Sequence, residues 1–182
     1  MIDFNRPNIS DQINRRIDTA LEMEQSFQPV RKYLGGSRIG VECERALQYE
    51  FTKTPVDPGK DFSGRLIRIF ARGHWVESYV VKILNKAGFG LSTVDENGNQ
   101  FGFECHEGYF KGHRDGAFIS GPDEFGPWPR LWENKGLAQK YFLQIVKHGI
   151  RAKSPIYYGQ TQYYMKKFNL TENPALFKIL TT

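Results

Sequence analysis

The chain has 182 residues with 40% hydrophobic and 25% charged side chains, an ordinary globular balance that excludes neither an enzyme nor a binding protein. A formal charge of +5 favours a polyanionic partner, because clustered lysines and arginines release counterions when they bind phosphates. The two cysteines, Cys43 and Cys105, lie far apart and outside any CxxC pattern, which argues against a disulfide framework or a closed zinc site.

The N-terminal residues MIDFNRPN are polar and lack the basic and then apolar order of an export signal. No apolar run approaches the length that a membrane span requires. We therefore expect a soluble protein of a reducing cytoplasm, with no membrane partner.

Apolar residues at spacings of three and four predict five helical segments. The first follows Ser10, a suitable N-cap, and the third is long, with a potential break at Gly73 and a C-cap at Gly88. The five segments cover residues 11–27, 33–51, 65–88, 138–149 and 154–169; the second opens with a Gly-Gly break at 35–36, and its helix follows this break, with Cys43, Ala46 and Leu47 on one face.

Alternating apolar residues predict the strands. Residues 89–95 and 100–110 form a hairpin through an Asn-Gly turn, and the strand signal continues through 109–121. Residues 130–136 resume the extended pattern after a loop rich in proline and glycine, and 175–182 end the chain as a strand. This order predicts an α/β (α+β) domain over residues 1–182, in which a helical appendage at 1–36 precedes a core at 37–182.

Acids and a lysine interrupt two of the strand-like stretches, GHRDG at 112–116 and WENKG at 132–136, where an uncompensated charge costs stability. Carboxylates on adjacent strands, Asp115 and Glu133, can together bind a hard cation such as magnesium. Residues two apart share a strand face, so Lys135 points into the same cleft as Glu133. Its ammonium can hold a water near the cation or neutralise charge on a reacting phosphate.

The long helix at 65–88 offers a third acid, Glu77, which can close the site from the side. His74 lies three residues earlier on the same helix face and competes for that role. A plainer interpretation also stays open, in which Glu133 and Lys135 form a buried or half-exposed ion pair of near-zero energy and Asp115 caps a turn before Gly116.

Gln160 and Tyr164, four residues apart on the helix after the lysine strand, complete a pattern that resembles the PD-(D/E)XK nuclease superfamily. Within it, the chain from Ser37 to the C-terminus is similar to the RecB-like and lambda-exonuclease-like (YqaJ-type) branch common in phages. The matching stretches are GSRIGVECERALQYEF for the N-terminal helix, RGHWVE for the first metal-ligand helix, GHRDG for the aspartate strand, WENKG for the Glu-x-Lys strand and QTQYY for the glutamine-tyrosine helix.

The resemblance implies a restriction-endonuclease-like core, with a central mixed sheet of four to five strands flanked by helices. It implies that Glu77, Asp115, Glu133 and the carbonyl of Asn134 bind Mg²⁺ or Mn²⁺, and it favours Glu77 over His74. Lys135 would position or activate the attacking water. The same resemblance implies that Gln160 and Tyr164 contact the DNA backbone or stabilise the helix of the active site; an exposed glutamine beside a core tyrosine is the plainer alternative.

The implied activity is a metal-dependent deoxyribonuclease, an exonuclease acting on linear DNA ends in phage-type recombination or DNA processing, in the cytoplasm of the host cell. A recombination or replication protein can be its partner, and ring-forming relatives make a homo-oligomer compatible with the resemblance. Supporting roles at the rim of the cleft fall to Arg114, Arg130, Lys140 and Lys147, and stacking roles to Tyr141, Tyr157, Tyr158 and Tyr163.

One departure from the branch concerns its iron–sulfur members, which pair an N-terminal cysteine with three more near the C-terminus. This chain has no cysteine after Tyr164, so no iron–sulfur cluster is expected, and Cys43 and Cys105 are interpreted as small buried thiols. Two other functions stay open: a non-catalytic DNA-end-binding or host-defence-inhibiting protein on the same fold, and an interaction domain with solvated acids. The presence of the acids and the lysine favours the nuclease.

Overall fold

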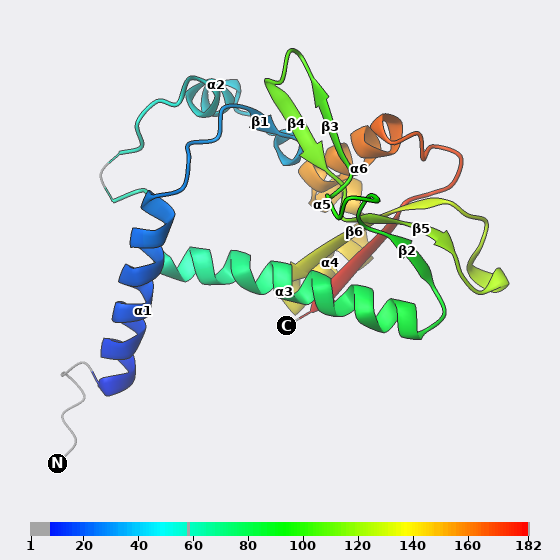
Figure 1. Ribbon diagram of the computed structural model, residues 1–182, viewed down its shortest axis with the longest axis horizontal. Coiled ribbons are helices and arrows are strands. Elements are labelled where there is room, and N and C mark those ends of the chain that lie inside the picture. The colour runs from blue at the N-terminus through cyan, green and yellow to red at the C-terminus, as the bar shows by residue number, and fades with distance from the viewer. Residues whose placement is uncertain (1–7, 58, 182) are drawn as a thin grey trace. The chain divides into compact units, whose positions relative to one another are not determined.

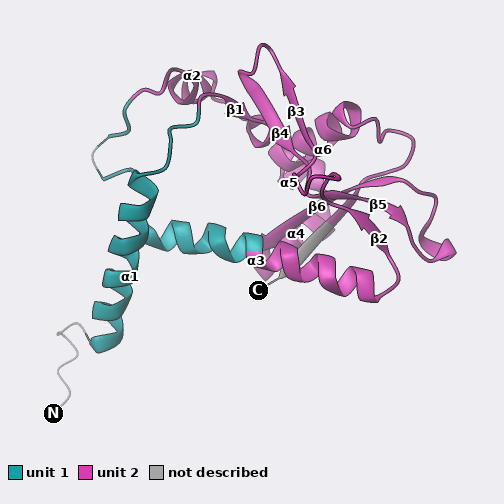
Figure 2. Ribbon diagram, viewed as in Figure 1, with its two compact units in different colours: residues 1–31, 55–74 teal, residues 32–54, 75–182 magenta. Residues whose placement is uncertain are grey.

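The computed structural model describes residues 8–57 and 59–181 of the chain, with side chains described up to residue 177. The chain divides into two compact units, Met1–Arg31 with Pro55–His74 and Lys32–Thr54 with Trp75–Thr182 (Figure 2). This division differs from the expected appendage at 1–36, because residues 55–74 are grouped with the N-terminal helix.

The first unit contains helix α1 (Ile9–Ser26) and the beginning of helix α3 (Gly64–Lys86). The N-cap of α1 is Asn8, whose side-chain oxygen accepts a hydrogen bond from the backbone N–H of Asp11 at 2.8 Å. The expected cap, Ser10, instead lies inside the first turn. Both residue types cap helices well, so composition alone does not distinguish them.

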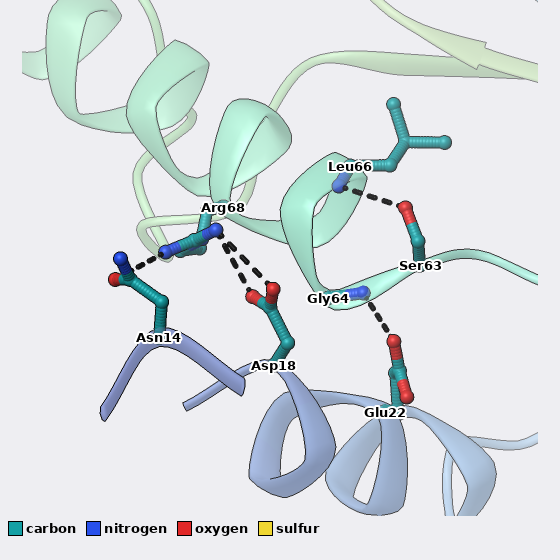
Figure 3. Close-up of polar contacts among 7 residues, drawn as sticks. All are labelled: Asn14, Asp18, Glu22, Ser63, Gly64, Leu66 and Arg68. Carbon is teal, nitrogen blue, oxygen red and sulfur yellow. Dashed lines mark hydrogen bonds and ion pairs between the residues drawn. The ribbon is translucent and has the colours of Figure 1, made fainter. Parts of the chain in front are cut away.

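The two helices of the first unit are joined by polar contacts (Figure 3). Arg68 forms an ion pair with Asp18 at 3.1 Å, and the backbone N–H of Gly64 donates to the Glu22 carboxylate at 2.7 Å. A β-carbon on Gly64 would lie 2.3 Å from the α-carbon of Asp18. The close approach of the two helices therefore requires glycine at this position.

Helix α3 is continuous from Gly64 to Lys86, so the expected break at Gly73 does not occur. A β-carbon on Gly73 would meet no atom within 4 Å. We expect Gly73→Ala to raise the free energy of unfolding by about 0.5–1 kcal/mol, because alanine loses less backbone entropy in a helix. Urea titration followed by circular dichroism measures the change.

Gly88→Ala is the matched control, since Gly88 follows α3 with a φ of +85°, a conformation that alanine resists. We expect it to destabilise the protein by about 1 kcal/mol. If both substitutions changed stability in the same direction, the assignment of an unbroken helix at Gly73 would be wrong.

The second unit contains two sheets together with several helices, and it makes the protein a mixed α/β fold (Figure 1). Its strands are β1 (Leu34–Gly35), β2 (Gly90–Ser92), β3 (Gly102–Cys105), β4 (Phe110–His113), β5 (Gly116–Ser120), β6 (Arg130–Leu137) and β7 (Leu176–Thr181). Besides the C-terminal part of α3, its helices are η1 (Gly36–Arg38), α2 (Glu44–Thr52), η2 (Asp123–Phe125), α4 (Gln139–His148), α5 (Ile150–Lys153) and α6 (Pro155–Lys167).

The larger sheet has four strands in the order β2-β5-β6-β7. β2, β5 and β6 pair antiparallel, whereas β6 and β7 run parallel. The smaller sheet has the order β1-β4-β3, with β1 parallel to β4. The expected single sheet is thus two mixed sheets, and the four-stranded one carries the Glu-x-Lys strand.

Alternation along β5 and β6 separates the core into two clusters on opposite faces of the sheet. Ala117 and Leu131 face α6, where they pack with Tyr164, Met165 and Leu170. Phe118 and Trp132 instead pack with Val76 and Val80 of α3. Helices α3 and α6 therefore cover the two faces of this sheet, and they bring side chains to the strands between them.

Two details of the strand prediction were wrong. Residues 100–110 are not one strand but the hairpin of β3 and β4, whose turn contains His106 and Glu107 at φ of 52° and 55°. Residues 109–121 are also interrupted, between His113 and Gly116. The predicted Asn-Gly turn does occur, with Gly98 at φ +80° and an antiparallel bridge between Val94 and Gln100, yet β2 and β3 belong to different sheets.

The helices were predicted more accurately than the strands. α4 ends at the expected Gly149, which has a φ of +81°, and α6 begins at Pro155, the expected first-turn proline. Among the residues that the structure describes, no helix combines the length and the apolar character that crossing a membrane requires.

Candidate functional site

Asp115 lies where the chain leaves the smaller sheet and enters the larger one. β4 ends at His113 and β5 begins at Gly116, so Asp115 stands between two strands, whereas the sequence had placed it within a strand. Its Oδ2 accepts a hydrogen bond of 2.8 Å from the backbone N–H of Asn134 on β6. This bond fixes the Asp115 carboxylate beside the strand that carries Glu133 and Lys135.

Arg114, the residue before Asp115, points into the protein instead of the cleft rim where it was expected. Its side chain is buried, with the guanidinium carbon 4.2 Å from the ring centre of Phe101 and 5.1 Å from that of Phe168. One of its nitrogens donates to Ser92 at 3.4 Å. Arg114 is therefore a structural cation held between aromatic rings.

Glu133 and Lys135 lie on the face of β6 that α6 covers, as their two-residue spacing predicted. Glu133 is only 1% exposed, and Lys135 donates from Nζ to Glu133 Oε1. Glu133 is buried and Lys135 is half-buried, which agrees with the plainer interpretation of a buried or half-exposed pair and contradicts the interpretation of Glu133 as a solvated acid. Glu133 Oε2 is also buried, and no residue whose side chain the structure describes forms a hydrogen bond with it. A carboxylate in this position is costly unless another group compensates it.

Helix α6 brings Gln160 and Tyr164 to the same carboxylate. Gln160 is buried and donates from Nε2 to Glu133 Oε1 at 3.0 Å, which excludes the alternative of an exposed glutamine. Tyr164 is 2% exposed and lies one turn further along the helix. The sequence pattern thus placed both residues correctly, and Gln160 restrains the orientation of Glu133 directly.

Tyr164 is held by two glycines from distant parts of the chain. A β-carbon on Gly36 would lie 2.6 Å from the Tyr164 hydroxyl, and one on Gly112 would lie 2.7 Å from it. Both positions must therefore be glycine for the tyrosine ring to lie where it does. Sequence reasoning interpreted the Gly35–Gly36 pair only as a break before a helix.

We expect Gly36→Ala to destabilise the protein by about 1–3 kcal/mol, because the added methyl group displaces a buried ring that has no free space beside it. The displacement also shifts α6 and weakens the bond from Gln160 to Glu133. Chemical denaturation measures the first effect, and Gly136→Ala is the control, since a β-carbon there meets nothing within 4 Å. Equal stability of the two variants would contradict the packing described for Tyr164.

Glu77 contributes a third carboxylate from α3. It is half-buried, and burial raises its pKa to about 7, with the charge of Asp115 adding to the rise and that of Lys135 opposing it. Glu77 is thus near enough to both residues to interact with their charges. His74, which competed with Glu77 for this role in the sequence, is exposed.

The remaining pKa shifts follow from burial of the same cluster. Burial raises the pKa of Glu133 to about 7 against the opposing charge of Lys135, and Asp115 and Glu77 add to the rise. Burial favours the neutral amine of Lys135, but the charges of Glu133 and Asp115 outweigh it and raise the Lys135 pKa. Burial, with the charge of Glu133, raises the Tyr164 pKa to about 12. The lysine is therefore charged and the tyrosine neutral at neutral pH, while Glu77 and Glu133 bind a proton more readily than exposed glutamates do.

These shifts predict that stability falls as pH rises when no divalent cation is added. The folded protein retains protons on Glu77 and Glu133 that the unfolded chain releases near pH 4.5, so folding binds protons between about pH 4.5 and 7. We expect the free energy of unfolding to fall by on the order of 1–3 kcal/mol across this window. Urea midpoints at pH 5 and pH 8 in EDTA measure it.

Substitution of both acids, Glu77→Gln with Glu133→Gln, removes the groups responsible and should flatten the pH profile in this window. If the double variant retained the full pH dependence of stability of the wild-type protein, other groups would be responsible for that dependence.

The basic and aromatic residues expected around the cleft have varied roles. Arg130 donates to the carbonyl oxygens of Pro127 and Gly126, both at 2.9 Å, and so anchors a loop, whereas Lys140 and Lys147 are exposed. The tyrosines are mostly occupied by protein contacts: Tyr141 bonds to Ser154, Tyr157 lies beside the Lys135 ammonium, Tyr158 lies beside Arg151, and Tyr163 packs on Phe103 and Phe110.

The cysteines differ from each other in environment. Cys43 is exposed at the N-terminus of α2, so its expected burial on a helix face was wrong. Cys105 is partly buried, with its Sγ 3.6 Å from the Tyr163 hydroxyl, in agreement with a thiol at the edge of the core.

The donor set suits a hard divalent cation. Three carboxylates and an amide oxygen are the ligand types that Mg²⁺ and Mn²⁺ prefer, and Glu133 Oε2 is a buried oxygen without a partner. Among the described residues, however, no three Asp, Glu, His or Cys side chains stand in an arrangement that could already hold an ion. A cation shared by Glu77, Asp115 and Glu133 therefore requires rotation of at least one of these side chains.

Neither the family models, nor the characterised proteins, nor the solved structures with which the chain was compared gave a match.

Proposed function

We propose that the protein is a Mg²⁺- or Mn²⁺-dependent deoxyribonuclease with a PD-(D/E)XK-type, restriction-endonuclease-like core. The observation that carries the proposal is the meeting of Glu77, Asp115, Glu133 and Lys135, from three distant segments of the chain, around the buried Glu133 carboxylate. A buried acid with an unpartnered oxygen costs stability, and a cation-dependent reaction gives a physical reason for keeping it.

In this proposal Glu77, Asp115 and Glu133 hold the cation, and the carbonyl of Asn134 is a further ligand. When bound, the cation lowers the pKa of a coordinated water and stabilises the charge on the leaving oxygen. The chain's own residues prepare the site: Gln160 orients Glu133, and the backbone N–H of Asn134 fixes Asp115.

Lys135 has two tasks in the proposed reaction. Before substrate binds, its ammonium keeps Glu133 from being fully protonated at neutral pH, because it opposes the effect of burial on the Glu133 pKa. During hydrolysis, the same ammonium positions the attacking water or balances the negative charge that grows on the phosphate. The raised pKa of Lys135 keeps it charged for both tasks.

DNA is proposed as the substrate because the chain is basic and a phosphodiester is the group that a cation and an ammonium together activate. Exonuclease action on linear ends, a role in phage-type recombination or DNA processing, a protein partner, homo-oligomers and a cytoplasmic location belong to the same proposal and rest on the resemblance of the sequence motifs.

The test uses the purified protein with linear duplex, closed circular duplex and single-stranded DNA, in Mg²⁺, in Mn²⁺ and in EDTA. Cation-dependent loss of linear DNA, with circular DNA intact, is the expected result. Cleavage of circular DNA would replace the exonuclease with an endonuclease. Cation-independent binding without cleavage would favour the DNA-end-binding protein, and neither binding nor cleavage would contradict both.

A further inference from the structure

A groove with a cavity volume of about 300 Å³ adjoins the carboxylate cluster in the second unit. Glu77, Ser78 and Lys82 of α3 form one wall, and Thr93 and Val94, which follow β2, form the other. Glu77 belongs to both the groove and the carboxylate cluster. The groove therefore borders the cluster at Glu77, on the α3 side.

The opposite wall also lies against the cluster. A β-carbon on Gly116 would be 3.1 Å from the side-chain methyl of Thr93, so Thr93 packs directly on the residue that follows Asp115. A ligand in the groove consequently lies between Glu77 and Thr93, and Thr93 in turn contacts the residue that follows Asp115.

The lining of the groove combines three kinds of group. Lys82 is exposed and forms no ion pair among the residues that the structure describes. Ser78 and Thr93 offer hydroxyls, while Val81 and Val94 offer apolar surface. A nucleotide has one group to match each of these: a phosphate for the ammonium, sugar oxygens for the hydroxyls, and an apolar base face for the valines.

The groove ends in a region that disfavours phosphates. A neighbouring cavity of about 310 Å³ shares Val94 but is lined by Asp95 and Glu96, whose charges repel a phosphate. Phosphate binding is thus favoured at Lys82 and opposed one cavity further on. This arrangement suits a single nucleotide rather than a long strand.

We propose that the groove binds one unpaired nucleotide of the DNA substrate, next to the phosphate that is cleaved, with Lys82 contacting its phosphate. The inference rests on the proposed function and specifies its substrate as an end with a single-stranded nucleotide. A paired base must leave its stack to enter a recess of this size, which costs a few kcal/mol in a duplex and least where the strand is already single.

The test is the affinity of the full chain for two fluorescent DNA duplexes, one with a short single-stranded overhang and one blunt, in EDTA so that no cleavage occurs. Lys82→Ala should weaken binding of the overhang DNA about five- to tenfold and change blunt DNA binding much less. The slope of log affinity against log salt should fall by about 0.7, the loss of one phosphate contact on a single strand.

Lys86→Ala is the control, because Lys86 lies about one turn further along α3 and does not line the groove. Lys82→Arg, which retains the charge, should restore most of the affinity. Equal effects of Lys82→Ala and Lys86→Ala, or an unchanged salt slope, would overturn the inference; so would an equal loss of affinity for both DNAs.

These outcomes separate the groove from the nuclease proposal. Overhang binding that depends on Lys82, without cleavage in Mn²⁺, supports the groove and contradicts the nuclease. Cleavage that is indifferent to Lys82 in both kcat and KM supports the nuclease and contradicts the groove.

Discussion

Glu133→Gln is expected to remove cation-dependent DNA cleavage, with a loss on the order of 10³-fold. The introduced amide has nearly the same shape as the carboxylate, and after rotation its oxygen can still accept the hydrogen bond from Gln160. The neutral side chain, however, lacks the negative charge that binds a divalent cation. Single-turnover cleavage of linear DNA in Mn²⁺ measures the loss.

The substitution leaves the Lys135 ammonium without its partner, which costs up to about 3–5 kcal/mol, so the melting temperature of the variant is measured beside its activity. The chain supplies its own control in a second Glu–Lys pair, Glu104 with Lys111, which is 2.6 Å long and exposed on the smaller sheet. Glu104→Gln should leave cleavage unchanged. Retained cleavage in Glu133→Gln, with a normal melting temperature, would remove the basis for the nuclease proposal.

Lys135→Ala is expected to affect both activity and stability. Without the ammonium, the pKa of Glu133 rises above about 7, so at neutral pH this acid becomes protonated and unfit to bind a cation. Cleavage should fall on the order of 10²- to 10³-fold. Breaking a buried ion pair costs up to about 3–5 kcal/mol, and protonation of Glu133 reduces that cost at lower pH.

The destabilisation by Lys135→Ala should therefore be larger at pH 8 than at pH 6, and Mn²⁺ should partly reverse it if the cation replaces the lost charge. Urea denaturation at both pH values, with and without Mn²⁺, tests this. Lys111→Ala is the matched control, since an exposed pair contributes at most about 1 kcal/mol. Similar losses in the two lysine variants would show that the buried pair has no special role.

The site could be predicted from sequence because its chemistry depends on spacing within single elements. The two-residue spacing of Glu133 and Lys135 fixes a shared face in any strand, and the four-residue spacing of Gln160 and Tyr164 fixes a shared face in any helix. Their burial and the bond from Gln160 to Glu133 depend on how the elements pack, and the resemblance suggested that arrangement.

The division into two sheets could not be predicted in the same way. His106 and Glu107 adopt positive φ in the turn between β3 and β4 although neither residue type signals such a turn, so residues 100–110 appeared continuous. The alternating pattern likewise does not show that a strand changes its partner sheet. The prediction that Arg114 lies at the rim of the cleft was wrong because this change of sheet was not foreseen. A basic residue next to a candidate metal-binding acid normally suggests a contact with substrate.

Because the chain changes sheets between His113 and Gly116, the consecutive residues Arg114 and Asp115 contact different parts of the protein. The guanidinium of Arg114 closes an aromatic cluster, and the carboxylate of Asp115 meets the backbone of β6. Insertion or deletion of one residue here would shift the register of the connection. The Asp115 carboxylate would then face the aromatic rings, and the Arg114 guanidinium would face Glu133. The length of this short connection is therefore under a stricter constraint than its composition, and homologues should tolerate length changes in the β3–β4 turn far better than here.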